Sequence, residues 1–320
     1  MTGGGDIMTS NSKGVLMESA GTLDVTIGNS SVETTMNGRI ANTGQGTLNM
    51  TVQGNTTFAA DVTATQVTVN SGKTAKLGDV ATISGQNGNA VLTKVHMNSA
   101  GISGTANASS VKDALLELKS GASFTVKDVG LSNVTLSAEA KDTLVQLQNV
   151  TGAATLQTGT YEVQAVQSAA AVATTTTLNY ELAGSIELTL ANSDTAVVIS
   201  ADPWADCGEE MAAYDLTFSM NLTLGADFTV DSLTGADWRE LVSFGGAFGD
   251  LLDAQGATYL SSADEVVAIT GNPYVFYDYS VTDGIGSLVV TVQGVTIPEP
   301  TTATLSLLAL AALAARRRRK

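Results

Sequence analysis

"GTLDVTIGN" at residues 21–29 and "GTLNMTVQGN" at residues 46–55 are two copies of one pattern. Each copy begins with Gly-Thr-Leu and ends with Gly-Asn. The residues between these ends alternate between apolar and polar, which places the apolar side chains on one face of a β-strand. Gly and Asn favour the turn that ends such a strand. The apolar members are Leu23, Val25 and Ile27 in the first copy, and Leu48, Met50 and Val52 in the second.

The pattern continues after the second copy. A third strand is predicted at residues 67–72, and "LGDVATISGQNGN" follows at residues 77–89. Short alternating strands that end in Asn/Gly turns every 20–25 residues are typical of a solenoid, in which each coil buries its apolar face on the next. We therefore predict that residues 1–160 form a parallel β-solenoid (β-helix). The layout of strands and turns in this stretch resembles that of the passenger domains of autotransporters, although the two share no diagnostic motif.

The composition changes along the chain. One of the sixteen aromatic residues lies within residues 1–120, whereas twelve lie beyond residue 200. A thin coil can fill its core with aliphatic side chains, whereas a sandwich usually uses aromatic ones. We predict an acidic, β-sandwich-like domain over residues 161–296. Its strongest strands are expected at residues 214–224 and 284–297, with a helical insertion at residues 236–256 that Gly245 and Gly246 divide in two.

One further helix is expected in the first part of the chain. Residues 110–113, Ser-Val-Lys-Asp, resemble a capping box, and "VKDALLELKSG" continues to a glycine. This predicts a helix of two to three turns on the side of the solenoid.

Charge excludes one class of partner. The net charge is −16, and residues 201–296 hold fifteen acidic residues and a single base, Arg239. Such a surface repels phosphate backbones, so we expect no nucleic-acid partner.

The sequence offers no catalytic motif. His96 is the only histidine and Cys207 the only cysteine, which excludes multi-histidine sites and internal disulfides. "SGKT" at residues 71–74 lacks the first glycine of a phosphate loop. A Ca²⁺ site near Asp278 and Asp283 is the weaker hypothesis because regular Asp spacing is missing. We predict no enzyme activity, no catalytic residue, no cofactor and no metal.

The C-terminus combines three features. Pro298, Glu299 and Pro300 precede an apolar stretch at residues 301–315, and residues 316–320 read Arg-Arg-Arg-Arg-Lys. As a helix the apolar stretch spans about 22 Å, which is shorter than the roughly 30 Å hydrocarbon core of a membrane. Arginine side chains that reach toward the membrane surface can cover part of the difference. We predict a transmembrane anchor whose basic end, Arg316, Arg317, Arg318, Arg319 and Lys320, stays in the cytoplasm.

These residues, in this order, resemble the PEP-CTERM sorting signal of Gram-negative bacteria. The resemblance covers residues 297–320 alone and implies a sorting motif at Pro298, Glu299 and Pro300. It implies as partner an exosortase, a membrane-embedded cysteine transpeptidase that removes or transfers the tail. It also implies a body outside the inner membrane, either attached to the surface or secreted after processing.

Such a signal is normally accompanied by a signal peptide. Residues 1–20 contain no apolar run of the required length. Either the start codon is misplaced or the chain is a fragment, and we expect a missing upstream segment.

Three functions compete. The first is a non-enzymatic structural or adhesion protein of the cell surface. The alternative is an extracellular polysaccharide-acting enzyme or carbohydrate-binding protein on a β-helix scaffold, with polysaccharide as its partner. The third is ice or carbohydrate-surface binding through threonine ladders such as Thr22/Thr26 and Thr47/Thr51, which the irregular period of the strands counts against.

Overall fold

The computed structural model describes residues 14–18, 20–29, 31–168, 177–203, 214–228, 230, 233–269 and 273–297. Over these ranges the protein is mainly β, as predicted. The strands up to residue 167 are β1 Val15–Met17, β2 Thr22–Ile27, β3 Thr34–Met36, β4 Ile40–Asn42, β5 Thr47–Val52, β6 Thr56–Phe58, β7 Val62–Val69, β8 Thr74–Leu77, β9 Ala81–Gly85, β10 Ala90–Asn98, β11 Gly101–Gly104, β12 Ser110–Leu118, β13 Ser123–Lys127, β14 Gly130–Ala138, β15 Leu144–Gln148, β16 Thr151–Gln157 and β17 Gly159–Gln167.

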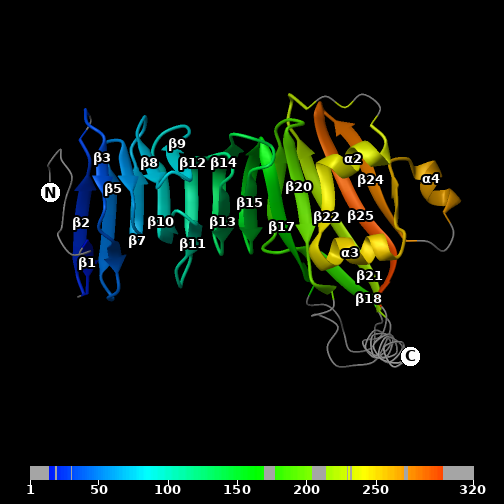
Figure 1. The fold of residues 1–320 in the computed structure, drawn as a ribbon, viewed down its shortest axis with the longest axis horizontal. Helices are drawn as coiled ribbons and strands as arrows, with labels where there is room; N and C mark the ends of the chain where they lie inside the picture. Colours follow the sequence, from blue (N-terminus) through cyan, green and yellow to red (C-terminus); the bar gives the residue numbers. More distant parts are fainter. Residues whose placement is uncertain are drawn as a thin grey trace, which may run out of the picture.

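The remaining elements gather at the other end of an elongated molecule, where two helices, α2 (Gly235–Leu241) and α3 (Gly246–Ala254), lie against the last strands and a third, α4 (Ala263–Ala268), projects beyond them (Figure 1). They are the strands β18 Thr177–Leu182, β19 Ile186–Leu190, β20 Thr195–Ser200, β21 Tyr214–Leu224, β22 Val242–Gly245, β23 Thr258–Leu260, β24 Tyr274–Thr282 and β25 Ile285–Ile297, and the helices α2 Gly235–Leu241, α3 Gly246–Ala254 and α4 Ala263–Ala268.

The two copies of the opening pattern pair with each other. Strands β2 and β5 are parallel, and the aligned pairs are Leu23–Leu48, Val25–Met50 and Ile27–Val52. β7 then pairs with β5 in the same direction, from Asn49–Gln66 to Val52–Val69. The alternating pattern therefore sets the register, because a slip of one residue would turn every apolar side chain outward.

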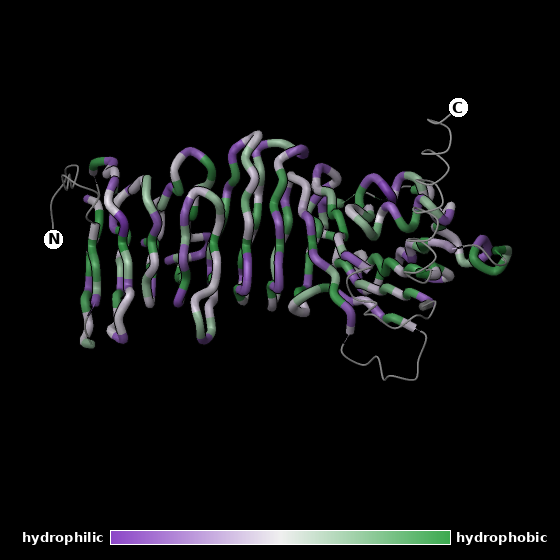
Figure 2. Tube along the Cα trace, turned by 60° about the horizontal axis from the view of Figure 1, so that its bottom comes forward, coloured by the Kyte–Doolittle hydropathy of each residue, from purple (hydrophilic) through white to green (hydrophobic). Residues whose placement is uncertain are grey.

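Parallel pairing is the rule along most of the first part. It joins β1 to β4 to β7, β3 to β6 to β8, β12 to β14 to β16, and β11 to β13 to β15 to β17. In Figure 2, hydrophobic and hydrophilic segments alternate along many of these strands. Strands such as β5 and β13 accordingly bury alternate side chains.

Two strands, β9 and β10, run against this direction. β9 is antiparallel to both β8 and β12, and β10 is antiparallel to β7, β11 and β12. Parallel pairing resumes from β12 onward. Strands β9 and β10 therefore interrupt the parallel ladder between β8 and β12.

Asp and Asn side chains brace corners of neighbouring coils. Asp113 and Asn133 both have positive φ angles, +54° and +53°. The amide Nδ2 of Asn133 donates to Oδ1 of Asp113 at 2.8 Å. Asn149 and Asp128 repeat this arrangement at the same distance. Asn and Asp tolerate the left-handed conformation better than most residue types, which suits them to these corners.

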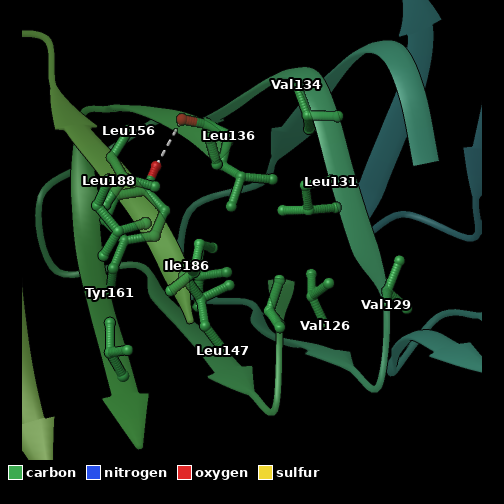
Figure 3. Packing of buried hydrophobic residues seen from close by; sticks show 14 of the residues in the cluster. Val126, Val129, Leu131, Val134, Leu136, Leu147, Leu156, Tyr161, Ile186 and Leu188 are labelled. Atoms are coloured by element: carbon green, nitrogen blue, oxygen red, sulfur yellow. Dashed lines mark hydrogen bonds between the residues drawn. The ribbon is translucent and has the colours of Figure 1, made fainter. Parts of the chain in front are cut away.

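The interior is one hydrophobic cluster that extends from Met17 to Ile297. Around the fully buried Tyr161, aliphatic side chains from facing strands point toward one another (Figure 3). The Tyr161 hydroxyl lies 2.7 Å from the carbonyl oxygen of Leu136 and 2.6 Å from that of Gln157. The labelled members of the packing are Val126, Val129, Leu131, Val134, Leu136, Leu147, Leu156, Ile186 and Leu188.

The pairing continues past the predicted domain boundary between residues 160 and 161, which lies within β17. β17 pairs in parallel with β15 before it and with β20 after it, and β20 pairs with β22. Beyond this, β21, β25 and β24 form an antiparallel sheet. The strands predicted at residues 214–224 and 284–297 are confirmed as β21 and β25.

The helical insertion is confirmed as α2 and α3, with the short strand β22 between them. α2 starts at a capping box in which the Thr234 side chain and Asp237 bond to each other's backbone N–H groups. Phe248 of α3 packs edge-on against Phe218 and Phe244, with ring centroids 6.0 and 4.9 Å away. The aromatic residues near the C-terminus therefore serve the core, as their distribution predicted.

The helix predicted over residues 110–120 is wrong. Residues 110–118 form strand β12, whose inward side chains are Val111, Ala114, Leu116 and Leu118. β12 has partners on both sides, β14 in parallel and β9 with β10 in antiparallel. Pairing on both edges and burial of alternate residues outweigh the helix propensity of Ala, Leu, Lys and Glu.

Candidate functional site

Four surface hollows on the described residues differ in the charges that line them. Three contain carboxylates, and only the fourth contains a base without any acid. The carboxylates are Glu162 and Asp202 in the first, Glu117 and Glu139 in the second, and Glu181 and Glu187 in the third. The fourth hollow has a volume of about 490 Å³, and Lys94 is its charged residue. In a protein of net charge −16, this lining is the exception.

We call this hollow the Lys94 groove. It lies where β4 turns into β5, and it extends across β7 and β10 to the loop after β11. Apart from Lys94, its lining consists of hydroxyl, amide and small side chains. These residues are Asn42, Gly44, Gln45, Gly46, Thr47, Thr63, Ala64, Thr65, Thr105, Ala106 and Asn107.

Lys94 is held in a backbone conformation that is unusual for its type. Its φ is +48°, in the middle of strand β10. Its carbonyl oxygen accepts three hydrogen bonds, from Thr105 N at 2.8 Å, Thr105 Oγ1 at 2.7 Å and Ser109 Oγ at 2.7 Å. These bonds fix the loop after β11 over the end of the groove.

The same loop contains two more residues with positive φ, Asn107 at +78° and Ala108 at +64°. A side-chain-bearing residue in this region costs about 1–3 kcal/mol unless its surroundings compensate. Strain of this kind concentrates at binding and catalytic sites, and here it lies beside β9 and β10, the two strands that are antiparallel to their neighbours.

The other end of the groove is a polar corner. Nδ2 of Asn42 donates to the Gly46 carbonyl at 2.8 Å and to Thr65 Oγ1 at 3.1 Å. Because a carbonyl can only accept, these bonds fix the orientation of the amide. Thr65 Oγ1 accepts a second bond from Leu48 N at 3.1 Å, which leaves its own proton free to donate. Oδ1 of Asn42 is buried and has no hydrogen-bond partner in the described part of the protein.

The Lys94 ammonium has no carboxylate partner among the described residues, whose four ion pairs involve other side chains. The groove therefore combines one cation with several hydroxyl and amide groups. It lacks the paired carboxylates, or the nucleophile beside a base, on which hydrolytic chemistry depends. The arrangement suits binding rather than proton transfer.

His96, the only histidine, lies two residues from Lys94 on β10. Its Nε2 is 3.3 Å from Oδ2 of Asp61, and both side chains are partly exposed. Thr63 and Ser103 are its neighbours on the adjacent strands. The pair is a surface contact beside the groove, and neither residue lines it.

The threonines proposed as a ladder do align. Thr22 is opposite Thr47, and Thr26 is opposite Thr51, which in turn is opposite Thr68. The next strand in that row, β10, presents Val91 instead. The row therefore covers three strands and ends at β10.

The acidic residues suggested for Ca²⁺ lie apart from one another. Asp278 is exposed on β24, and Asp283 has a φ of +53° in the Asp-Gly turn between β24 and β25. Within the described ranges, no three His, Cys, Asp or Glu side chains are grouped as metal ligands.

The predicted sorting residues follow directly on β25, whose last residue is Ile297. Ile297 is buried and pairs with Tyr214. Pro298, Glu299, Pro300 and the basic residues 316–320 lie outside the described residues, as does the predicted transmembrane helix. Among the helices that are described, none is long and apolar enough to cross a membrane.

The family model of the PEP-CTERM protein-sorting motif matches residues 296–320. The chain carries a PEP-CTERM motif. This confirms the resemblance at the C-terminus, and the motif indicates sorting to the cell envelope through exosortase. No curated protein and no solved structure matches the chain, so no homologue supports the resemblance of the body to autotransporter passengers.

The sequence did not reveal the Lys94 groove. Its lining residues come from β4, β5, β7, β10 and the loop after β11, so they are scattered over more than sixty positions, from Asn42 to Asn107. The antiparallel pairing of β10 brings them together, and no local pattern of residues signals that pairing.

Proposed function

We propose that the protein is a non-enzymatic cell-surface or secreted protein with a structural or adhesive role. In this proposal the body is a parallel β-solenoid that continues into an acidic β domain. Exosortase recognises Pro298, Glu299 and Pro300, while the apolar segment and residues 316–320 hold the chain in the inner membrane until it is processed.

The observation that carries this proposal is the PEP-CTERM match at residues 296–320. A sorting signal of this kind serves a body that works outside the inner membrane. The extended ladder of parallel strands, packed around one continuous core, is consistent with a rigid stalk.

A non-enzymatic role is supported by the kind of hollows that the body offers. Three of them are lined by two carboxylates each and one by Lys94, and His96, the only histidine of the sequence, is not among the described residues that line them. The acidic surface between residues 201 and 296 would keep such a protein soluble outside the cell.

The test is the intact mass of the protein recovered from membrane, surface and culture fractions. Wild type should yield a mature form that ends near Pro298, whereas Glu299→Ala should stay unprocessed in the membrane fraction. Glu240→Ala, at an exposed position of α2, removes the same charge and should mature like wild type. If Glu299→Ala matures normally, the exosortase step of the proposal is wrong.

A carbohydrate-binding role is the second candidate, and the Lys94 groove is the observation that favours it. Hydroxyl and amide side chains match the alternating donors and acceptors of a saccharide. This candidate is compatible with a structural role, because a surface stalk that holds polysaccharide would be both.

A further inference from the structure

We propose that the Lys94 groove binds an acidic saccharide of the uronate class. The carboxylate of such a ligand would pair with the Lys94 ammonium, and its hydroxyl groups would bond to Thr63, Thr65 and Asn107. The inference relies on the proposed surface location only for the encounter with a polysaccharide; the binding chemistry belongs to the groove itself.

Charge selects the anionic part of the ligand. The other three hollows carry carboxylates and would repel an acid, whereas this groove carries Lys94 and no acidic residue. Lys94 is half-buried and takes part in none of the described ion pairs. A lysine without a counter-ion can pair directly with an incoming carboxylate through a charge-assisted hydrogen bond.

The remaining lining selects a polyhydroxylated ligand over a compact inorganic anion. Phosphate or sulfate is usually held by several cations or by a nest of backbone N–H groups. Here a single cation lines a volume of about 490 Å³, together with threonine hydroxyls, amides and small side chains. A small anion would leave most of these groups without a partner.

Two hydroxyls are suitably placed to bind the ligand. Thr65 Oγ1 already accepts from Asn42 and Leu48, so its proton is the group that it can offer. The hydroxyl of Thr63 has no side-chain hydrogen bond in the described structure. Both residues are half-buried on β7, so their hydroxyls are partly desolvated before a ligand arrives.

The groove is also rigid before binding. Three hydrogen bonds to the Lys94 carbonyl hold the loop of Thr105 and Ser109, and Asn42 closes the turn to Gly46. A site that is already ordered loses less conformational entropy when its ligand binds. The strain at Lys94 and Ala108 is thus maintained in the folded protein rather than induced by the ligand.

Isothermal titration calorimetry with tetragalacturonic acid tests the proposal on the purified full chain. The fully methyl-esterified tetramer serves as the neutral control. We expect the acid to bind and the ester to bind at least about tenfold more weakly, as for the loss of one charge-assisted hydrogen bond. Raising the salt concentration should weaken binding of the acid but not of the ester.

Lys94→Gln should lower the affinity for the acid by about tenfold or more while leaving the weak affinity for the ester unchanged. Lys112→Gln is the matched control, because Lys112 is exposed on β12 outside the groove and its loss changes the net charge equally. Thr63→Val keeps the shape and strand propensity, and it should weaken both ligands by a few-fold.

The proposal is overturned if the acid does not bind at millimolar concentration, if acid and ester bind equally, or if Lys94→Gln behaves like Lys112→Gln. If Lys94→Gln does not fold, as judged by circular dichroism, the Thr63→Val and ester comparisons decide. Processing of Lys94→Gln at the cell surface should be normal, so failure of this inference is distinguishable from failure of the sorting proposal.

Discussion

Removing the hydroxyl group of Tyr161 should destabilise the coil around it. Tyr161 is fully buried, and its hydroxyl lies 2.7 Å from the Leu136 carbonyl and 2.6 Å from the Gln157 carbonyl. Burial raises the pKa of the Tyr161 phenol, so the group keeps its proton and donates it to one of these oxygens. It therefore joins β14, which contains Leu136, to β17, which contains Tyr161 (Figure 3).

The magnitude follows from what Tyr161→Phe removes. The net loss of one hydrogen bond costs about 0.5–1.5 kcal/mol, and leaving a buried carbonyl without its donor adds to this. We expect the free energy of unfolding to fall by about 1–2 kcal/mol. Tyr161→Ala, which also empties the ring's volume, should cost about 3–5 kcal/mol.

Tyr274→Phe is the matched control. The Tyr274 hydroxyl also makes a hydrogen bond of 2.7 Å, to Oε1 of Gln293, but this bond is exposed. Water replaces the lost partner there, so the expected change is below about 0.5 kcal/mol. Urea unfolding, followed by circular dichroism and by tryptophan fluorescence, measures all three variants. Equal shifts of the midpoint for Tyr161→Phe and Tyr274→Phe would refute the reasoning.

Two further changes test the ladder. The Lys119 ammonium lies 2.6 Å from Glu139 Oε1, and it lowers the pKa of the Glu139 carboxyl below its usual 4.5. The ionised carboxylate therefore stabilises the fold at pH values above 4.5. This stabilisation is lost as the pH falls through the lowered pKa. Glu139→Gln should therefore flatten the dependence of the melting temperature on pH below about 4.5. Gly101→Ala should destabilise by roughly 1–3 kcal/mol, because its Cβ would lie 2.0 Å from the Thr125 carbonyl oxygen of the next coil. Gly130→Ala, whose nearest contact is 3.3 Å, should cost less in the same thermal melts.

The register of the first coils could be predicted because the sequence repeats it. The apolar positions of residues 21–29 recur 25 residues later, and β2 and β5 pair at that offset, from Thr22–Thr47 to Ile27–Val52. The alternation has a period of two, so it fixes which face is buried as well as which residues are opposite each other. No tertiary information was needed for this step.

The strand at residues 110–118 could not be predicted in the same way. Ala, Leu, Lys and Glu favour helices, and Ser110 with Asp113 imitates a helix start. In the structure Asp113 has a φ of +54° and bends β12 at a corner, where it accepts from Asn133. The alternation of Ala114, Leu116 and Leu118 prevails in the fold, because β12 has hydrogen-bonded partners on both edges.

The groove is hidden from the sequence for a related reason. Where parallel coils repeat, each residue has an equivalent one coil away, and the pattern of one coil predicts the next. At β9 and β10 this equivalence ends, because β10 pairs with β7 in the opposite direction and Lys94 has no counterpart in a neighbouring coil. The corner is formed by residues with positive φ and by polar side chains, and these residues do not have to match equivalent positions on neighbouring strands. A basic residue such as Lys94 can therefore lie there, on an otherwise acidic protein, without disturbing the strand pairing on either side.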